Sequence, residues 1–138
     1  MKEWTVEATN ENIPVITEEI GRELDRLDCS RTARRKINVA LDELLNNIAN
    51  YAYAPETGDV TVQMRYDEGS RTVSITMIDS GVAYNPLEKA DPDITLEAEE
   101  RHIGGLGILM VKKKMDGMDY LRDNNRNVLT IHKKIQED

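Results

Sequence analysis

The 138-residue sequence predicts an α+β fold of the two-layer sandwich type, in which three main helices cover one face of an antiparallel or mixed sheet. In two segments apolar residues recur every three or four positions, which is the period of an amphipathic helix. In other segments they alternate with polar residues, which indicates half-buried strands. The segments follow one another as strand, helix, helix, two strands, loop, helix and two strands. This order is typical of helices packed on one side of a sheet.

The first strand and the first two helices are predicted in the N-terminal part of the chain. Residues 5–9 alternate weakly and indicate a short strand. Asn10 or Asn12 can cap the first helix, and Ser30 can cap a second, longer helix that continues to about Tyr53. The apolar positions of the first helix are Ile13, Ile16, Ile20, Leu24 and Leu27, and those of the second are Ile37, Leu41, Leu44, Leu45, Ile48 and Ala52.

Two neighbouring strands and a long loop follow. Residues 59–66 and 71–78 are predicted strands, and Asp-Glu-Gly-Ser at 67–70 is a favourable hairpin turn between them. Residues 79–103 show no sustained period. A loop of this length is unusual in so small a domain, and long loops are commonly lids or binding segments.

The last third of the chain predicts a helix and a second pair of strands. Gly-Gly-Leu-Gly at 104–107 opens a third helix that ends near Met115, with three lysines in its last turn, where cations suit the helix dipole. Residues 120–121 belong to a further strand. Asn-Asn-Arg-Asn at 124–127 is a predicted turn, and residues 128–134 form the last strand.

Composition and charge exclude several classes of protein. Hydrophobic residues make up 39% of the chain, which is enough for one buried core and too much for a disordered chain. The formal net charge of −8 argues against general binding to nucleic acid or to an anionic membrane. Cys29 is the one cysteine, which excludes an internal disulfide and a multi-cysteine zinc site. The longest apolar run, residues 103–111, is far too short to span a bilayer, and we expect a cytoplasmic protein.

Glu43 and Asn47 are the first candidate functional residues. They lie four positions apart on the second predicted helix, so they share one face of it, beside the apolar line. A carboxylate and an amide in this arrangement can hold a hydrated magnesium ion or orient an attacking hydroxyl. A solvated polar flank of the helix is the alternative.

Two further candidate sites contain glycine. Asp79 directly follows an apolar strand, where a carboxylate needs hydrogen bonds, and Gly81 allows the backbone to approach a ligand closely. A common Asp–Gly turn is the alternative at this site. The glycines at 104–107 precede a helix and leave backbone N–H groups free for a phosphate, whereas a flexible hinge is the alternative there.

The order and spacing of these three sites resemble the ATP-binding fold shared by gyrase, histidine kinases and mismatch-repair ATPases. The stretches ALDELLNNIANYAY (40–53), IDSGVAYNP (78–86) and GGLGILMVKKKMD (104–116) are most similar to its stand-alone branch. That branch contains bacterial anti-sigma factors that are also serine kinases. The resemblance extends over roughly residues 5–134, and it implies one ATP-binding domain over residues 1–138 with a lid at about 83–103.

The resemblance also implies roles for individual residues, with ATP and Mg²⁺ as cofactors. Asn47 matches the asparagine that coordinates magnesium, and Glu43 matches the general base that acts on a serine or threonine of a protein substrate. Asp79 matches the aspartate that accepts a hydrogen bond from the adenine amino group. The other matching nucleotide-binding positions are Gly81 beside the ring, Gly105 and Gly107 at the phosphates, and Thr130 near the adenine.

The function that the resemblance implies is an anti-sigma regulatory factor that is also an ATP-dependent serine/threonine protein kinase. Such a protein sequesters a sigma factor, phosphorylates an anti-anti-sigma protein of the STAS type and forms a homodimer. A non-catalytic ATP-sensing binding module that regulates a signalling partner is the alternative. His102 and Ile103 stand where the branch often has a phosphate-contacting arginine, which favours the alternative, whereas the intact pair of Glu43 and Asn47 favours the kinase.

Overall fold

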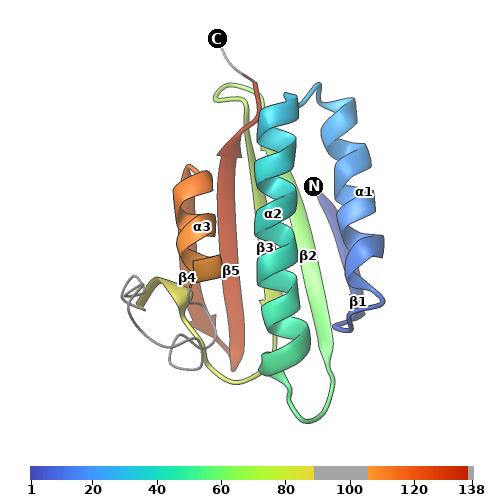
Figure 1. Ribbon diagram of the computed structural model, residues 1–138, viewed down its shortest axis with the longest axis vertical. Helices are drawn as coiled ribbons and strands as arrows, with labels where there is room; N and C mark the ends of the chain where they lie inside the picture. Colours follow the sequence, from blue (N-terminus) through green and yellow to red (C-terminus); the bar gives the residue numbers. More distant parts are fainter. Residues whose placement is uncertain (89–105, 137–138) are drawn as a thin grey trace.

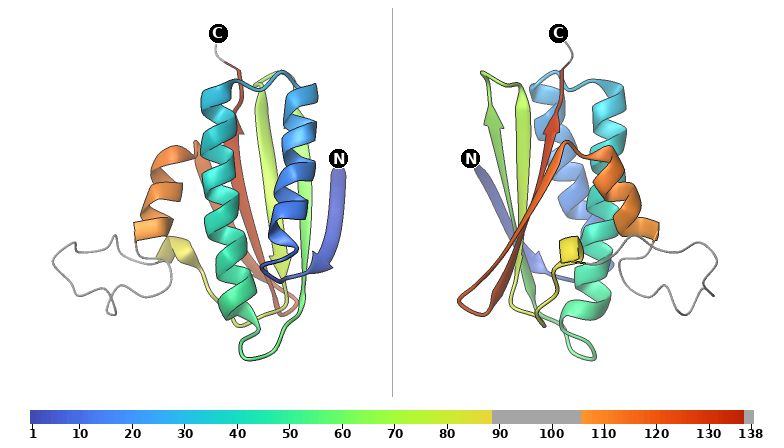
Figure 2. Two further views of the ribbon diagram at one scale, coloured as in Figure 1. Left: turned by 45° about the vertical axis from the view of Figure 1, so that its right-hand side comes forward. Right: turned by 90° about the vertical axis from the view of Figure 1, so that its left-hand side faces the viewer.

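Five strands form one sheet and three α-helices cover one of its faces within residues 1–88 and 106–136, which the computed structural model describes (Figure 1). Figure 2 shows the two layers from the side, with the helices together on one face of the sheet. In chain order the elements are β1 (Lys2–Glu7), α1 (Ile13–Arg26), α2 (Arg31–Asn47), the π-helix η1 (Ile48–Ala52), β2 (Asp59–Asp67), β3 (Thr72–Asp79), the 3-10 helix η2 (Pro86–Glu88), α3 (Leu106–Lys114), β4 (Gly117–Asp123) and β5 (Arg126–Lys134).

The strand order is β1-β2-β3-β5-β4, and every neighbouring pair is antiparallel. This confirms the predicted α+β sandwich and decides between an antiparallel and a mixed sheet. Strand β1 begins and ends earlier than the predicted strand at 5–9, since Lys2 lies opposite Met64 and Glu7 lies opposite Asp59. Edge strands bury few side chains, so their alternation locates them poorly.

The hydrophobic core lies between the sheet and the helices. Strands β2 and β3 bury every second residue, as their predicted alternation requires. The helices bury the apolar lines that the sequence predicts. Core side chains include Ile16, Ile20 and Leu24 of α1, Ile37 and Leu41 of α2, Val62 of β2, Ile75 and Met77 of β3, and Ile131 of β5. In the described part of the chain, none of the helices is both long enough and apolar enough to cross a membrane.

Helix α2 begins at its predicted cap and ends differently from the prediction. The hydroxyl oxygen of Ser30 accepts a hydrogen bond from the backbone N–H of Ala33 at 3.1 Å, which confirms the N-cap. The α-helix stops at Asn47 and continues as the π-helix η1, so the predicted single helix to Tyr53 is wrong in its last turn. Single π-helical turns widen a helix locally and are frequent at functional sites.

Two asparagines differ from the prediction in different ways. Asn12 occupies the predicted N-cap position of α1, but its side chain donates to the backbone oxygen of Glu7 and makes no capping hydrogen bond. The predicted turn at 124–127 contains only Asn124 and Asn125, whose positive φ angles of 50° and 61° suit a tight two-residue hairpin. Strand β5 therefore starts at Arg126, and Asn127 is a buried strand residue instead of a turn residue.

Replacing Ser30 by alanine is expected to lower the free energy of unfolding by about 1 kcal/mol, because the N–H of Ala33 loses its acceptor. The measurement is urea denaturation followed by circular dichroism. Thr32→Ala is the matched control, since Thr32 is exposed on the same helical turn and is expected to change stability by less than about 0.5 kcal/mol. Equal stabilities of the two variants would contradict the capping role.

Candidate functional site

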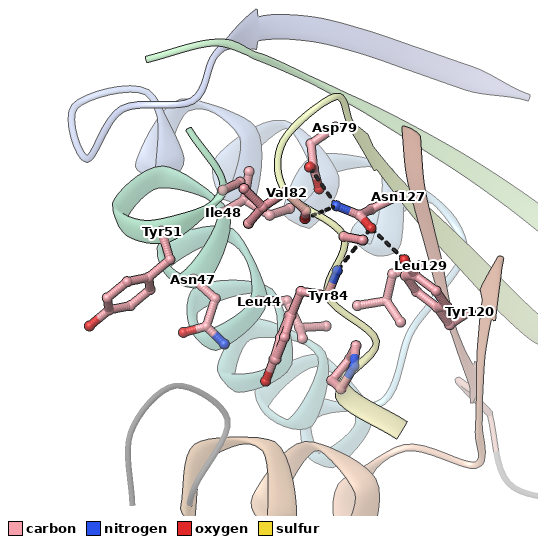
Figure 3. A pocket seen from close by; sticks show the side chains of 13 residues that line it. Leu44, Asn47, Ile48, Tyr51, Asp79, Val82, Tyr84, Tyr120, Asn127 and Leu129 are labelled. Carbon is pink, nitrogen blue, oxygen red and sulfur yellow. Dashed lines mark hydrogen bonds between the residues drawn. The ribbon is translucent and has the colours of Figure 1, made fainter. Parts of the chain in front are cut away.

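A pocket lies between the C-terminal part of α2, the end of β3, the loop after β3 and the hairpin of β4 and β5 (Figure 3). The space open to the centres of water molecules is about 160 Å³, roughly ten times the ~10–15 Å³ that one water needs. The pocket can therefore take a small organic ligand. Its apolar walls come from Leu44, Ile48, Ala52, Val82, Pro86 and Leu129, and its polar groups include Asn47, Asp79 and Asn127.

Asp79 supplies the most deeply buried charge of the pocket. It is the last residue of β3, it lies on the helix-facing side of the strand, and only 6% of it is exposed. Its Oδ1 atom accepts hydrogen bonds from the backbone N–H of Gly81 at 2.9 Å and from Nδ2 of Asn127 at 3.0 Å. No hydrogen bond to Oδ2 of Asp79 is found among the described residues. This oxygen is the natural acceptor for an N–H donor on a ligand in the pocket.

Gly81 allows the loop after β3 to pack closely against η1, the π-helix that continues α2. A Cβ atom added to Gly81 would lie 2.3 Å from the backbone oxygen of Ala52, which also accepts a hydrogen bond from the N–H of Val82. Arg122 holds the same loop, since its Nη1 donates to the oxygen of Gly81 at 2.9 Å. The sequence predicts a close approach of Gly81 to a ligand, whereas the close approach in the structure is to the backbone of η1. Gly81 is not among the described residues that line the pocket.

Asn47 and Glu43 lie on the flank of α2 that faces α3, as their spacing predicts. Asn47 lines the pocket, and its Nδ2 is buried with no hydrogen-bond partner in the described part of the chain. The half-buried Glu43 packs against the first turn of α3, because a Cβ added to Gly107 would lie 1.8 Å from Oε1 of Glu43. Burial raises the pKa of the Tyr84 phenol, and the nearby charge of Glu43 raises it further. Tyr84 lines the same pocket as Asn47.

The predicted lid and phosphate-binding glycines lie partly outside the described residues. Gly105 and residues 89–103 of the predicted lid belong to that part of the chain. Ala83 and Tyr84, at the start of the predicted lid, line the pocket. Gly107 is the second residue of α3, and its lack of a side chain makes room for Glu43.

Thr130 lies away from the pocket. It alternates with the buried Leu129 and Ile131 on β5, so its side chain lies on the opposite face of the sheet from the helices and the pocket. Its hydroxyl instead pairs with the hydroxyl of Thr76 at 2.9 Å. Thr130, predicted to lie near an adenine, is therefore not among the described residues that line the pocket.

Asn127 is the site residue that sequence reasoning missed. It lines the pocket on the helix-facing side of β5 and is 6% exposed. The sequence pattern could have identified it, because Ile131, Leu129 and Asn127 are alternate residues and therefore lie on the same face of the strand. Asn127 is instead predicted to belong to a four-residue turn.

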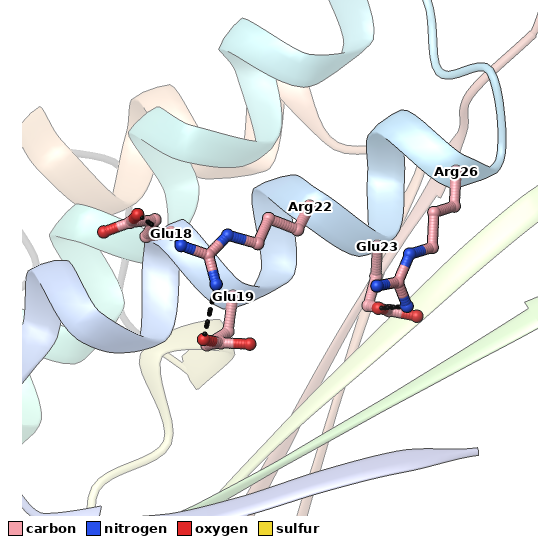
Figure 4. A network of polar contacts seen from close by, with 5 residues as sticks. All are labelled: Glu18, Glu19, Arg22, Glu23 and Arg26. Atoms are coloured by element: carbon pink, nitrogen blue, oxygen red, sulfur yellow. Dashed lines mark hydrogen bonds and ion pairs between the residues drawn. The ribbon is translucent and has the colours of Figure 1, made fainter.

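The ion pairs on α1 lie apart from the pocket. Arg22 pairs with Glu18 and Glu19 at 2.8 Å and 3.2 Å, and Arg26 pairs with Glu23 at 2.6 Å (Figure 4). These pairs are spaced three or four residues apart along α1, and the side chains of Arg22 and Arg26 are largely exposed. Each pair therefore contributes only about 0.3–0.5 kcal/mol. They stabilise α1 and contribute no group to the site.

The arrangement suits a ligand with two different ends. The apolar walls can hold a flat ring, and Oδ2 of Asp79 can accept a hydrogen bond from an amino group on it. Asn47 offers an amide oxygen and a buried N–H₂ group towards the side where α3 begins. No cluster of three or more His, Cys, Asp or Glu in the described residues could hold a metal by itself. A metal ion at Asn47 would take its other ligands from the bound molecule and from water.

Comparison with known proteins adds independent findings. A family model described as "Histidine kinase-like ATPase domain" matches residues 6–133. Serine/threonine-protein kinase BtrW of Bordetella bronchiseptica is 28% identical over 102 residues, which cover 74% of this chain and 71% of that protein. Serine-protein kinase RsbW of Bacillus mycoides is 25% identical over 140 residues, which cover 99% of this chain and 86% of that protein.

A crystal structure of the RsbU and RsbW domains of a Mycobacterium tuberculosis protein is similar in fold. The TM-score is 0.64 at 13% sequence identity. The match covers 100% of this chain and 34% of that chain, so this chain spans about a third of the solved protein. This likeness supports the fold.

Gly81→Ala is expected to lower the free energy of unfolding by about 1–3 kcal/mol, the usual cost of overpacking, because the backbone oxygen of Ala52 cannot move away from the new methyl group. Thermal or urea denaturation measures the change. Gly69→Ala is the matched control, since a Cβ there would meet its nearest neighbour at 3.9 Å. The two variants having the same stability would disprove the close packing at Gly81.

Proposed function

Because the chain belongs to the family of histidine kinase-like ATPase domains, we propose that its pocket binds ATP and that the protein is a serine/threonine protein kinase of the anti-sigma type. Two relatives that match across most of the chain are named serine or serine/threonine protein kinases, which supports this proposal. The observation that carries it is the carboxylate of Asp79, a residue that is 6% exposed and lines an apolar pocket, and whose Oδ2 accepts no hydrogen bond from the described residues.

Adenine fits the chemistry of the deep end of the pocket. Its ring is flat and apolar on both faces, and its exocyclic amino group is a hydrogen-bond donor. Oδ2 of Asp79 would accept from this amino group, and Leu129 and Ile48 would pack against the ring. Guanine has a carbonyl oxygen at the same position, and two acceptors facing each other in a buried site repel.

Asn47 is the residue that would hold the magnesium ion that accompanies ATP. When bound, magnesium and ATP supply the phosphoryl group and the positive charge that neutralises the phosphates during transfer. The side-chain oxygen of Asn47 is a suitable hard ligand, and its buried N–H₂ group would gain a phosphate oxygen as acceptor. The start of α3 lies beside the same flank of α2, where Gly107 meets Glu43, and the backbone N–H groups of a helix start suit phosphates.

Glu43 is the proposed general base. A serine hydroxyl is a weak nucleophile until a positioned group takes its proton, and a carboxylate within hydrogen-bond reach can do so. Glu43 lies one helical turn from Asn47 and is half-buried, so it is near the proposed phosphate site and still reachable by a partner protein. The carboxylate would take the proton of the attacking hydroxyl of that partner.

The partners follow from the resemblance to the stand-alone branch. We propose that the protein sequesters a sigma factor, phosphorylates a STAS-type anti-anti-sigma protein and acts as a homodimer in the cytoplasm. The alternative function is a non-catalytic ATP-sensing module. The observation that favours it is the sequence His102-Ile103 in the place of the phosphate-contacting arginine.

Asp79→Asn is expected to weaken ATP binding by about 10- to 150-fold, the value of a hydrogen bond to a charged group. Isothermal titration with ATP and GTP in the presence of Mg²⁺ measures this, and wild-type protein is expected to favour ATP. Asp59→Asn is the matched control, because Asp59 is an exposed carboxylate at the start of β2 and does not line the pocket. Equal affinity for GTP, or unchanged binding by Asp79→Asn, would rule out the adenine assignment.

Glu43→Gln is expected to lower phosphoryl transfer by about 10²- to 10⁴-fold, the usual contribution of a general base. Binding of ATP should persist, because glutamine keeps the shape and helix propensity of glutamate. The assay follows radiolabelled phosphate from ATP to candidate STAS-type proteins of the same genome. Asp42 is an exposed neighbour on α2, so Asp42→Asn is the control and should transfer phosphate to the candidates as wild-type protein does. Wild-type protein that binds ATP and labels none of the candidates would favour the sensing module.

A further inference from the structure

Asn127 makes four hydrogen bonds at the inner end of the pocket (Figure 3). Its Nδ2 donates to Oδ1 of Asp79 at 3.0 Å and to the backbone oxygen of Val82 at 2.8 Å. Its Oδ1 accepts from the backbone N–H of Tyr84 at 3.2 Å and from the hydroxyl of Tyr120. An amide group can make about this many strong hydrogen bonds, so the side chain is fully used.

The orientation of the Asn127 amide is determined by its neighbours. On one side it meets two groups that can only accept, a carboxylate and a backbone oxygen. On the other side it meets a backbone N–H, which can only donate. Turning the amide over would place oxygen against two acceptors and N–H₂ against a donor, so only one orientation satisfies all of them.

This orientation decides which oxygen of Asp79 faces a ligand. Oδ1 already accepts from Asn127 and from the N–H of Gly81. Both donors come from protein groups, one on β5 and one in the loop after β3. The carboxylate therefore cannot rotate about its terminal bond without losing these hydrogen bonds, and Oδ2 stays available to the pocket.

Asn127 also connects the acceptor to the wall of the pocket. Val82 and Tyr84 are lining residues, and their backbones are the ones that Asn127 holds. Tyr120 ties the same amide to β4. One buried side chain thus ties the orientation of Asp79 to the position of the loop and to the hairpin of β4 and β5.

We propose that Asn127 is a positioning residue that determines base selectivity, because it fixes Asp79 so that a single carboxylate oxygen reads the exocyclic amino group of the base. This inference rests on the proposed binding of ATP. It assigns Asn127 no contact with the nucleotide, and its effect reaches the ligand through Asp79.

The test compares ATP with purine riboside triphosphate, which lacks only the amino group of adenine. Titration calorimetry with Mg²⁺ on the full chain gives both dissociation constants. The ratio is defined as the dissociation constant of purine riboside triphosphate divided by that of ATP. For wild-type protein a ratio of about 10 to 150 is expected, as for one hydrogen bond to a charged group. Asp79→Ala defines the ratio without that hydrogen bond, which is expected to be about 1 since neither nucleotide then has an acceptor.

Asn127→Ala is expected to lower the ratio towards that of Asp79→Ala. If the role of Asn127 were purely structural, the variant would bind both nucleotides more weakly by the same factor and the ratio would stay at the wild-type value. That result would overturn the proposal. Thr76→Val is the matched control, because Thr76 lies on the opposite face of β3 and pairs with Thr130. This variant is expected to keep the wild-type ratio.

Asn127→Asp provides a second variant of nearly the same volume. It keeps an acceptor for the N–H of Tyr84 and replaces the donor that faces Asp79 by an oxygen, so its ratio is also expected to fall. If Asn127→Ala yields no folded protein, the ratio of Asn127→Asp decides in the same way. Wild-type protein that binds neither nucleotide would contradict the proposed function itself. Tight binding with a wild-type ratio near 1 would contradict the role of Asp79 and, with it, this inference.

Discussion

The hydrogen bond between Nδ2 of Asn127 and Oδ1 of Asp79 supports the whole inner end of the pocket. Asp79 is 6% exposed, and burying a carboxylate costs free energy unless it accepts hydrogen bonds. The N–H of Gly81 and Nδ2 of Asn127 both donate to its Oδ1. Because Oδ1 is satisfied by the protein, Oδ2 remains for a ligand. The backbone positions of Val82 and Tyr84 depend on the same amide, so the acceptor and the wall are built together.

Helix α2 is the element on which the other parts of the site meet. Its apolar line packs on the sheet, while Glu43 and Asn47 extend from the flank beside α3. Two glycines allow close contact with it. Gly81 brings the loop after β3 onto Ala52, at the end of the π-helical turn, and Gly107 brings the start of α3 onto Glu43. The pocket and the proposed base therefore keep a fixed distance along one rigid helix, which favours preorganised chemistry.

In the proposed function, recognition of the base and phosphoryl transfer depend on different residues. Asp79 and Asn127, at the ends of the central strands, would serve the recognition of the base. Glu43 and Asn47, on the helix, would serve the phosphate chemistry. A kinase and a nucleotide-sensing module would share the first pair and differ in the use of the second. The family resemblance and the names of the relatives favour the kinase.

The sequence by itself determined the fold class and the buried core. Hydrophobic periodicity is a local property, so it located the buried faces of α1, α2, β2 and β3, and helical spacing placed Glu43 beside Asn47. Contacts between distant strands are not local. Only the tertiary structure placed Asn127 opposite Asp79 and Thr130 opposite Thr76. The physical reason is register, because neighbouring residues of a strand lie on opposite faces of the sheet. The two-residue turn between β4 and β5 therefore brings Asn127 into the pocket and leaves Thr130 outside it.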